Sequence, residues 1–390
     1  MGVSDKQKII FVSNVFDNAK NGPAMYAQYL WRYFKDHPTI DFHVVAPFFL
    51  SGNDSRLHAA GVSSIAKLQY RKLAAVAAKL AKQDKRALIH ANASHSVADL
   101  LAFRDRLIVQ VNDYESATVF NDFFNKLRIK GLRNTLSSLL RYRQERKILK
   151  SAANIVCNSK YTQAIVTSRY HLDKKLCRVI YKAVDTSSFI DIADKTEPSF
   201  YPRGSKGKRF LFVGSNWSIK GLDTLIMAFS KVVEKHEDAF LTVVGGLNNA
   251  SLQAMSTLAK RYKVTSNIEF SGQKNRADIA NIMWSSDIFV LPSRQEAFGV
   301  AVIEAMAAGM PVIASKVGGI PEILDDERYG LLFEAENETQ LSEAMHKLII
   351  DHNRQSEMAV AGRQAVTRFS LEAMLPRIES LYKELAKISW

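Results

Sequence analysis

The chain has 390 residues, of which 47% are hydrophobic, and carries a formal net charge of +14. This length exceeds what one hydrophobic core usually spans, so we expect two compact domains. The two cysteines, Cys157 and Cys177, are too few for a disulfide framework, and the lack of a signal-peptide core or of about 18 consecutive apolar residues favours a cytoplasmic protein.

The first part of the chain alternates strands with helices, as a parallel sheet with helices on both faces requires. Buried strands are predicted at 8–12, 42–46, 87–90 and 107–111, and a helix at 23–34. The polar residues after two of these strands, including His90 and Asp113, are expected to line a cleft between the domains. Asp113 is a candidate ligand for a sugar or acceptor hydroxyl, although an Asn-Asp pair after a strand also suits a turn or a helix cap.

The segment 126–150 is strongly basic. It contains nine Lys or Arg residues against one acid, Glu145, a net +8 of the chain's +14. Leucines and isoleucines alternate with these cations at roughly helical spacing, which predicts a pair of basic amphipathic helices. Such a surface suits anionic lipid at the inner face of the cell membrane, or an anionic acceptor. A solvated basic face is the alternative, and no stacking or zinc motif supports nucleic acid.

The second domain is expected to follow a linker at 192–208 and to begin with a strand at 209–213. The loop after this strand, 214–221, carries Lys220 beside a glycine, just before a helix that starts at Leu222. A lysine at a helix start is well placed to neutralise a diphosphate, although a surface lysine in a loop is common. Further strands are predicted at 241–244 and 268–273, and a closing helix at 370–390.

The stretch from Phe289 to Leu324 reads as strand, loop, helix and strand, the unit of a doubly wound sheet. Glu296 lies in the loop and Glu304 lies two turns inside the helix. The amides of residues 298–300 at the helix start attract an anion, and Gly299 allows it to approach the backbone. Glu304 could then accept hydrogen bonds from a ribose. Two glutamates alone would also suit a helix-dipole partner and a solvated helix residue.

The motifs of this stretch form a longer pattern. They are Pro292-Ser293, Glu296-Ala297-Phe298-Gly299, Glu304-Ala305-Met306-Ala307, the run from Gly309 to Ala314, and Gly318-Gly319-Ile320-Pro321-Glu322. Over some thirty residues this pattern closely resembles the donor site of the retaining glycosyltransferases of family 4, which have the GT-B fold.

The resemblance implies an α/β protein with two Rossmann-like, doubly wound domains that face each other across a cleft. An acceptor-side domain would span 1–195 and a donor-binding domain 205–370. A C-terminal helix, 371–390, would cross back to the first domain.

The resemblance also implies a nucleotide-sugar donor, a UDP-sugar, and transfer to an acceptor hydroxyl in glycan, lipopolysaccharide, capsule or exopolysaccharide biosynthesis. Glu296, Lys220 and Asp113 are the catalytic candidates. The donor-binding candidates are Gly22, Ser215, Lys220, Gln273, Glu296, Ala297, Phe298, Gly299, Val300 and Glu304. Ser215 occupies a position where family members often have an arginine, so Lys220 is the main cation expected at the diphosphate.

No metal or other cofactor is expected. The sequence contains no Asp-x-Asp pair to hold a divalent ion, and helix amides with Lys220 can stabilise a leaving diphosphate instead. Two alternatives stay open: a GT-B nucleotide-sugar epimerase or phosphorylase, and a non-catalytic glycan- or lipid-binding relative.

Overall fold

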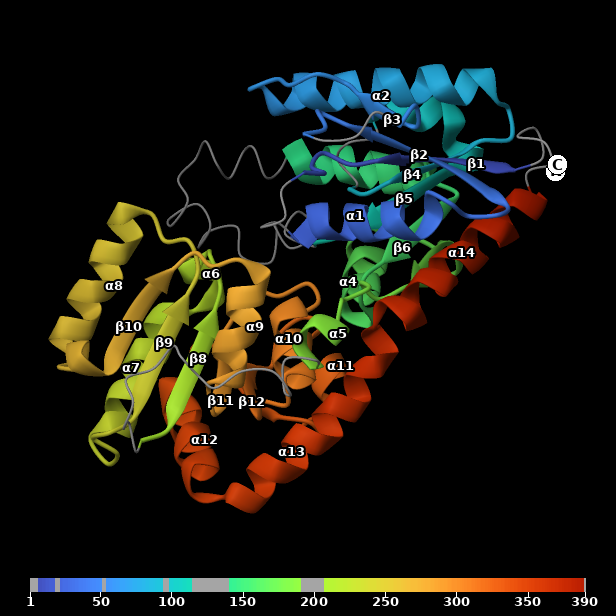
Figure 1. The fold of residues 1–390 in the computed structure, drawn as a ribbon. Coiled ribbons are helices and arrows are strands. Elements are labelled where there is room, and N and C mark those ends of the chain that lie inside the picture. Colours follow the sequence, from blue (N-terminus) through green and yellow to red (C-terminus); the bar gives the residue numbers. More distant parts are fainter. Residues whose placement is uncertain are drawn as a thin grey trace. The chain divides into compact units, whose positions relative to one another are not determined.

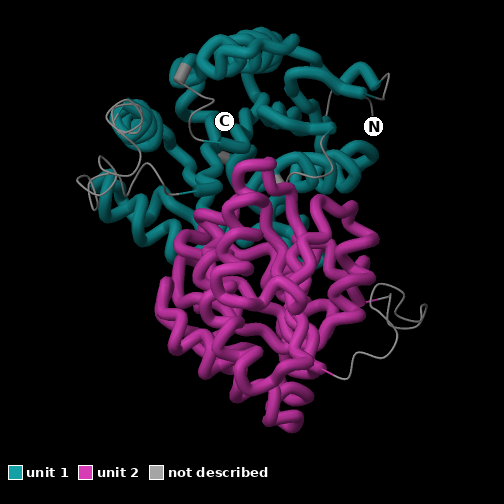
Figure 2. Tube along the Cα trace, turned by 90° about the vertical axis from the view of Figure 1, so that its left-hand side faces the viewer, with its two compact units in different colours: residues 1–183, 372–390 teal, residues 184–371 magenta. Residues whose placement is uncertain are grey.

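The computed structural model describes residues 6–17, 22–50, 54–93, 98–113, 140–190 and 207–388. The chain divides into two compact units, residues 1–183 with 372–390 (unit 1) and residues 184–371 (unit 2), which Figure 2 distinguishes by colour. Unit 2 begins at Val184, earlier than the linker expected at 192–208, most of which lies outside the described residues.

Unit 1 contains a seven-stranded parallel sheet in the order β3-β2-β1-β4-β5-β6-β7. The predicted strands are present within two residues of their expected bounds. The short strands β3 and β7 were not predicted, because three residues are too few to show a hydrophobic period. The strands are β1 (Gln7–Val12), β2 (Ile40–Ala46), β3 (Leu57–Ala59), β4 (Leu88–Ala91), β5 (Leu107–Val111), β6 (Asn154–Cys157) and β7 (Cys177–Val179).

Helices cover both faces of this sheet, with α1 on one face and α2 on the other (Figure 1). The helices of unit 1 are α1 (Gly22–Phe34), α2 (Ala66–Gln83), α4 (Lys160–Tyr170) and α14 (Leu371–Ile388), with short 3-10 helices at Ala98–Arg106 and Lys174–Leu176. Residues 140–151 are also helical. They are the described part of the basic segment, whose residues 126–139 lie outside the described ranges.

The C-terminal helix α14 is packed into unit 1 by apolar and polar contacts. Tyr382 is fully buried, and its ring lies 5.5 Å from that of Phe34, which in turn stacks on Phe42 of β2. On the polar edge, Tyr33 donates a 2.8 Å hydrogen bond to Glu379, and Arg178 makes two 2.6 Å hydrogen bonds to Glu384. Burial of large aromatic side chains is the main source of this stabilisation.

His90 of β4 is part of this contact and not of a cleft lining, so that expectation was wrong. Its side chain is fully buried, with Nδ1 2.6 Å from the Tyr382 hydroxyl and Nε2 3.1 Å from Gln110 Oε1. The neutral ring fits both bonds, since Nε2 donates to the amide oxygen while Nδ1 accepts from the hydroxyl. Burial lowers the pKa of His90 to about 4, although the Gln110 hydrogen bond opposes the shift.

We expect His90 to make unit 1 acid-sensitive. Between its usual pKa of 6.5 and the folded value of about 4, the unfolded chain binds a proton that the folded chain does not, so stability falls as pH falls through this window. Once the pH lies below the folded pKa, the free energy of unfolding should have fallen by about 3 kcal/mol, at roughly 1.4 kcal/mol per pKa unit. Urea unfolding at several pH values should show a shallower acid slope in His90→Gln than in the wild type. Parallel slopes would contradict this role.

Unit 2 contains a six-stranded parallel sheet in the order β10-β9-β8-β11-β12-β13. This is the strand order of a dinucleotide-binding Rossmann sheet. Each unit therefore holds one doubly wound sheet, and the predicted fold class is confirmed. The strands are β8 (Arg209–Val213), β9 (Phe240–Val244), β10 (Ile268–Gly272), β11 (Ile288–Leu291), β12 (Val312–Ser315) and β13 (Leu331–Phe333).

The helices of unit 2 are α5 (Ser187–Ile190), α6 (Trp217–Lys220), α7 (Leu222–Val233), α8 (Asn249–Arg261), α9 (Arg276–Trp284), α10 (Val300–Ala307), α11 (Ile320–Leu324), α12 (Glu338–Ile350) and α13 (His352–Ala365), with 3-10 helices at Thr265–Asn267 and Val366–Phe369. Helices α6 to α11 connect successive parallel strands of unit 2, α5 precedes the first of these strands, and α12 and α13 lead toward α14. Within the described ranges of both units, every helix is too short or too polar to cross a membrane.

Candidate functional site

The candidate site lies in unit 2, where the strand order reverses. Strands β8 and β11 are neighbours at the centre of the sheet, and the chain proceeds outward from them in opposite directions. In such sheets a ligand binds beyond the carboxyl ends of the two central strands. The loops that follow these strands, 214–221 and 292–299, are joined by a 2.7 Å backbone hydrogen bond from Arg294 to Ile219.

Lys220 and Glu296 contact each other at this reversal of the strand order, which is called the switch point of the sheet. Lys220 ends α6 after β8, Glu296 lies in the loop after β11, and the Lys220 ammonium donates a hydrogen bond to Glu296 Oε2. Their side chains are 25% and 15% exposed, so the pair is shielded but still open to a ligand. A cation and a carboxylate are thus held together beside the start of α10.

The start of α10 is shaped by Gly299, which has φ +115° and ψ 48° and carries no side-chain cap. The first amides to bond within this turn are those of Val302 and Ile303, which both donate to the Gly299 carbonyl. The amide of Val300 therefore has no acceptor within the helix, as at any helix start. An anion placed here would be stabilised by these donors and by the helix dipole.

Gly318, after β12, keeps the Glu296 loop in place. A Cβ atom at Gly318 would collide with the Glu296 carbonyl, and the next amide, of Gly319, donates a 3.3 Å hydrogen bond to that same oxygen. The glycine pair of the sequence motif thus allows a close backbone contact that a larger residue would prevent.

Glu304, on α10, is held by an arginine that sequence analysis missed. Arg276, the first residue of α9, donates a 2.7 Å hydrogen bond to Glu304 Oε1 and another of 2.7 Å to the Asp185 carbonyl. The guanidinium also lies over the Phe189 ring, 4.6 Å from its centroid. Burial raises the pKa of Glu304, while Arg276 counteracts the shift through its charge and its hydrogen bond. Arg276 therefore orients this carboxylate and favours its ionised form.

Arg294 was also missed, and it fixes the two central loops to each other. Its guanidinium makes two 2.8 Å hydrogen bonds to the Asp223 carboxylate, one of 2.7 Å to the Ser218 carbonyl and one of 2.7 Å to Glu336. The Asp223 hydrogen bond is the main reason that the pKa of Arg294 is raised. Because Arg294 lies two residues before Glu296, and Ser218 two before Lys220, these bonds set the separation of the ion pair.

We expect Arg294→Met to lower kcat/KM about tenfold, mostly through KM, because the loops that carry Lys220 and Glu296 lose their connection. Arg294→Lys should rescue little, since an ammonium cannot reproduce the paired contact with Asp223. Glu336→Ala is the matched control, because Glu336 touches the same guanidinium but is 64% exposed, and exposed ion pairs contribute little. Equal losses in the Met and control variants would contradict a positioning role for Arg294.

Two family models match the chain, Glycosyltransferase Family 4 over residues 20–188 and Glycosyl transferases group 1 over residues 194–365. Together they match most of both units. The chain belongs to the family 4 glycosyltransferases.

Individual relatives of this glycosyltransferase are distant. The D-inositol 3-phosphate glycosyltransferase of Corynebacterium jeikeium is 26% identical over 249 residues, 62% of this chain and 59% of the relative. The chain thus spans less than two thirds of this relative, and the next two curated relatives are matched over 55% and 60% of their lengths.

Solved structures match almost the whole chain. Sucrose-phosphate synthase from Thermosynechococcus elongatus has a TM-score of 0.79 at 21% identity, covering 97% of this chain and 99% of that one. Anabaena Alr3699/HepE in complex with UDP has a TM-score of 0.75 at 20% identity, covering 97% and 100%. At these identities the likeness concerns the fold, which is GT-B.

The predicted site residues of the glycosyltransferase are divided between the two units. Lys220, Glu296, Gly299, Val300 and Glu304 are gathered around the loops and helix that follow β8 and β11. Ala297 and Phe298 lie in the same loop, where the Phe298 ring is buried and contacts Phe369 edge-on, 5.6 Å away. The Phe298 ring is therefore part of the packed core of unit 2.

The remaining predicted residues lie elsewhere in the loop after β8, beside the edge strand β10, or in unit 1. Ser215 is exposed in the loop after β8. Gln273 is exposed just after β10, the edge strand, and faces Gly246 after β9. Gly22 starts α1 and Asp113 is exposed after β5, both in unit 1. Their roles toward the donor stay predictions.

The described parts of the chain contain no group of three or more His, Cys, Asp or Glu side chains that could hold a metal ion.

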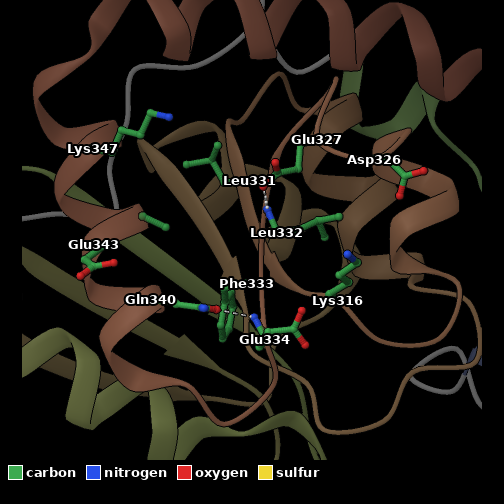
Figure 3. Close-up of a pocket in the computed structure, with 11 residues that line it drawn as sticks. Lys316, Asp326, Glu327, Leu331, Leu332, Phe333, Glu334, Gln340, Glu343 and Lys347 are labelled. Carbon is green, nitrogen blue, oxygen red and sulfur yellow. Dashed lines mark hydrogen bonds between the residues drawn. The ribbon is translucent and has the colours of Figure 1, made fainter.

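A cavity of about 700 Å³ is present in unit 2, and Figure 3 shows the residues that line it at the edge strand β13. None of them is a candidate site residue. The side chains of Glu327 and Gln340, which line the cavity, accept hydrogen bonds from backbone amides at this edge. Leu332 N donates to Glu327 and Glu334 N donates to Gln340, both over 2.9 Å. These hydrogen bonds protect the edge from pairing with another strand.

Proposed function

We propose that this chain is a retaining glycosyltransferase that moves a sugar from a UDP-sugar to an acceptor hydroxyl. The Lys220–Glu296 pair beside the first amides of α10 carries the proposal. At one switch point, this pair provides a cation for the diphosphate of the donor and a carboxylate for the sugar attached to that diphosphate. The family, the glycosyltransferase named for D-inositol 3-phosphate and the solved complex of HepE with UDP support this choice.

In the proposed arrangement, the diphosphate binds to the amides at the start of α10 and to Lys220. Donors that are already oriented toward the developing charge stabilise a leaving group without reorganisation. Glu304, oriented by Arg276, accepts hydrogen bonds from the ribose hydroxyls. Glu296 faces the sugar and stabilises positive charge that develops at its anomeric carbon. Attack from the face of the leaving phosphate, which takes the acceptor's proton, retains the configuration without a protein nucleophile.

Product analysis with nucleotide sugars tests this function. A thermal-shift panel first identifies the donor, because a ligand of the folded state raises the apparent stability. The selected donor is then incubated with and without acceptor alcohols, and with inorganic phosphate. We expect UDP release and a glycoside of retained configuration only when an acceptor hydroxyl is present. An isomerised nucleotide sugar, a sugar phosphate as the main product, or no nucleotide binding would overturn the proposal.

The acceptor that we propose is a lipid-linked or envelope glycan intermediate, with the enzyme at the inner face of the cell membrane. The described end of the basic segment supports this proposal. In residues 140–151, Ile148 and Leu149 are buried, whereas several cations point to solvent: Arg141, Arg143, Lys147 and Lys150 are exposed. The apolar face of this helix packs into the protein, so its cationic face is the part that is available to an anionic surface.

A further inference from the structure

Three titratable side chains form a hydrogen-bonded row at one edge of the unit 1 sheet, and the proposed function uses none of them. Asp41 Oδ2 lies 2.8 Å from His43 Nε2, and His43 Nδ1 lies 2.9 Å from His58 Nε2. The two imidazole rings are nearly parallel, with centroids 5.2 Å apart. Asp41 and His43 belong to β2, and His58 belongs to the edge strand β3. The row thus joins β3 to its neighbour in the sheet.

The register of the two strands explains why these rings meet. Val45 of β2 lies opposite His58 in the parallel ladder, and His43 precedes Val45 by two residues. Side chains two residues apart in a strand point to the same face, so His43 and His58 are diagonal neighbours. Since β3 has three residues, its backbone ladder is short, and side-chain pairs between the strands contribute much of its attachment.

The contact between the rings tolerates one added proton but not two. With both rings neutral, His43 donates from Nε2 to Asp41 and accepts at Nδ1 the proton that His58 carries on Nε2. One more proton gives His43 two N–H donors, and His58 then accepts at Nε2 while it carries its own proton on Nδ1. When both rings are charged, the two facing nitrogens each carry a hydrogen. The 2.9 Å contact then becomes repulsive.

The surrounding charges oppose the second proton. Burial and the charges of His43 and Lys8 lower the pKa of His58, while Asp41 counteracts the shift. Lys8, on β1, lies 3.8 Å from Asp41 Oδ2. Both rings therefore become charged only when the pH falls below the usual pKa of histidine.

The nearby carboxylates stay ionised in this range. Burial raises the pKa of Asp41, but the hydrogen bond and charge of His43, together with the charges of Lys8 and Arg56, lower it overall. Arg56 also lowers the pKa of Asp54, on which the His43 charge acts, to about 2, mainly through its side-chain hydrogen bonds. Between about pH 5 and pH 7, the groups of this cluster that change charge are thus the histidines.

The loop after β3 anchors the start of α2. Gly61 N donates to Pro47 O over 2.9 Å. Gln69, in the first turn of α2, donates to Gly61 O over 2.9 Å and accepts from Ser63 N over 2.6 Å. The helix has no side-chain cap at Ile65, so its first turn depends on this loop. A change in the position of β3 would therefore be transmitted to α2.

We infer that the contact between His43 and His58 is a pH-sensitive latch, which holds β3 on the sheet at neutral pH and releases it when both rings become charged. Between the lowered pKa of docked His58 and the usual value of 6.5, the released strand binds a proton that the docked strand does not. Docking therefore weakens as pH falls through this window. The latch gives unit 1 a reversible response to acid, goes beyond the proposed function and does not depend on it.

Hydrogen–deuterium exchange of the full chain, measured by mass spectrometry, tests the latch. After correction for the intrinsic effect of pH on exchange, protection of residues 57–61 should fall by up to about tenfold between about pH 7.5 and about pH 5.5, one unit below the usual pKa. Peptides from the interior strand β5 should keep their protection. A parallel loss in β5 would mean that unit 1 unfolds as a whole, as protonation of His90 would cause, and would overturn the inference.

Two variants and a matched control complete the experiment. His58→Gln should abolish the fall, because the amide can still donate to His43 but takes no proton. Lys8→Met should make the fall smaller, because loss of this charge raises the pKa of docked His58 toward its usual value. The control is His346→Gln, since burial lowers the pKa of His346 as well and its ring lies 5.3 Å from that of His236 in unit 2. It should leave the response of residues 57–61 unchanged. A wild-type fall in either of the first two variants, or no fall in the wild type, would overturn the inference.

Discussion

Replacing Lys220 by alanine is expected to lower kcat/KM with the UDP-sugar by about one to two decades while the protein stays folded. The ammonium is the cation that the structure holds beside the start of α10, and the loop position often occupied by arginine in the family is Ser215 here. A charge-assisted contact of this kind contributes about 1.5–3 kcal/mol. The loss should affect nucleoside diphosphate affinity as well as turnover, because the diphosphate is charged in both substrate and product.

Lys231→Ala is the matched control for this variant. Lys231 is also a lysine of unit 2 that is paired with a glutamate, Glu338, over 3.0 Å, but it lies on α7 away from the switch point. We expect its kinetics to equal those of the wild type. Calorimetry with UDP should show weaker binding in Lys220→Ala alone. An unchanged catalytic efficiency in Lys220→Ala would show that the phosphates are held elsewhere.

The parts of the fold that sequence analysis predicted are those specified by residues close together in the chain. The strand β8 has the predicted bounds, and β11 and β12 are the two strands of the predicted strand, loop, helix and strand unit, because short apolar runs bounded by glycine, proline or polar residues read as buried parallel strands. The helix start at Gly299 was predicted for the same reason. Once these strands are known, the switch-point rule places Lys220 and Glu296 near each other without any side-chain detail.

The parts that were missed depend on partners far apart in the sequence. Arg276 reaches Glu304 across 28 positions and Arg294 reaches Asp223 across 71. An arginine at the start of a helix or in a loop normally reads as a solvated residue, and no local pattern reveals its partner. The same holds for His90, whose burial depends on Tyr382, 292 positions away. A polar residue after a strand suggested a cleft, and only the packing of α14 shows that the ring is covered.

Replacing Arg276 by methionine is expected to make nucleotide binding depend on pH. Methionine can still pack on Phe189, but it removes both the charge and the hydrogen bond that oppose the effect of burial on the Glu304 pKa. The pKa of Glu304 should therefore rise further, because burial and the nearby Asp185 both raise it. A protonated carboxyl is a weaker acceptor for ribose hydroxyls than a carboxylate. UDP affinity should thus fall about tenfold or more at the acid end of the titration and recover as pH rises and Glu304 ionises.

Calorimetric titrations with UDP from pH 6 to 9 check this expectation, with the wild type as reference for the titration of UDP itself. Glu304→Gln should bind weakly at every pH, because it has no proton to lose. Arg209→Met is the matched control, since Arg209 forms an equivalent 3.1 Å ion pair with Asp287 at the beginning of β8, remote from the carboxyl ends of the strands. If the Arg276 variant binds UDP weakly without recovery at high pH, Arg276 contacts the nucleotide itself. If it binds as the wild type does, Glu304 needs no partner to stay ionised.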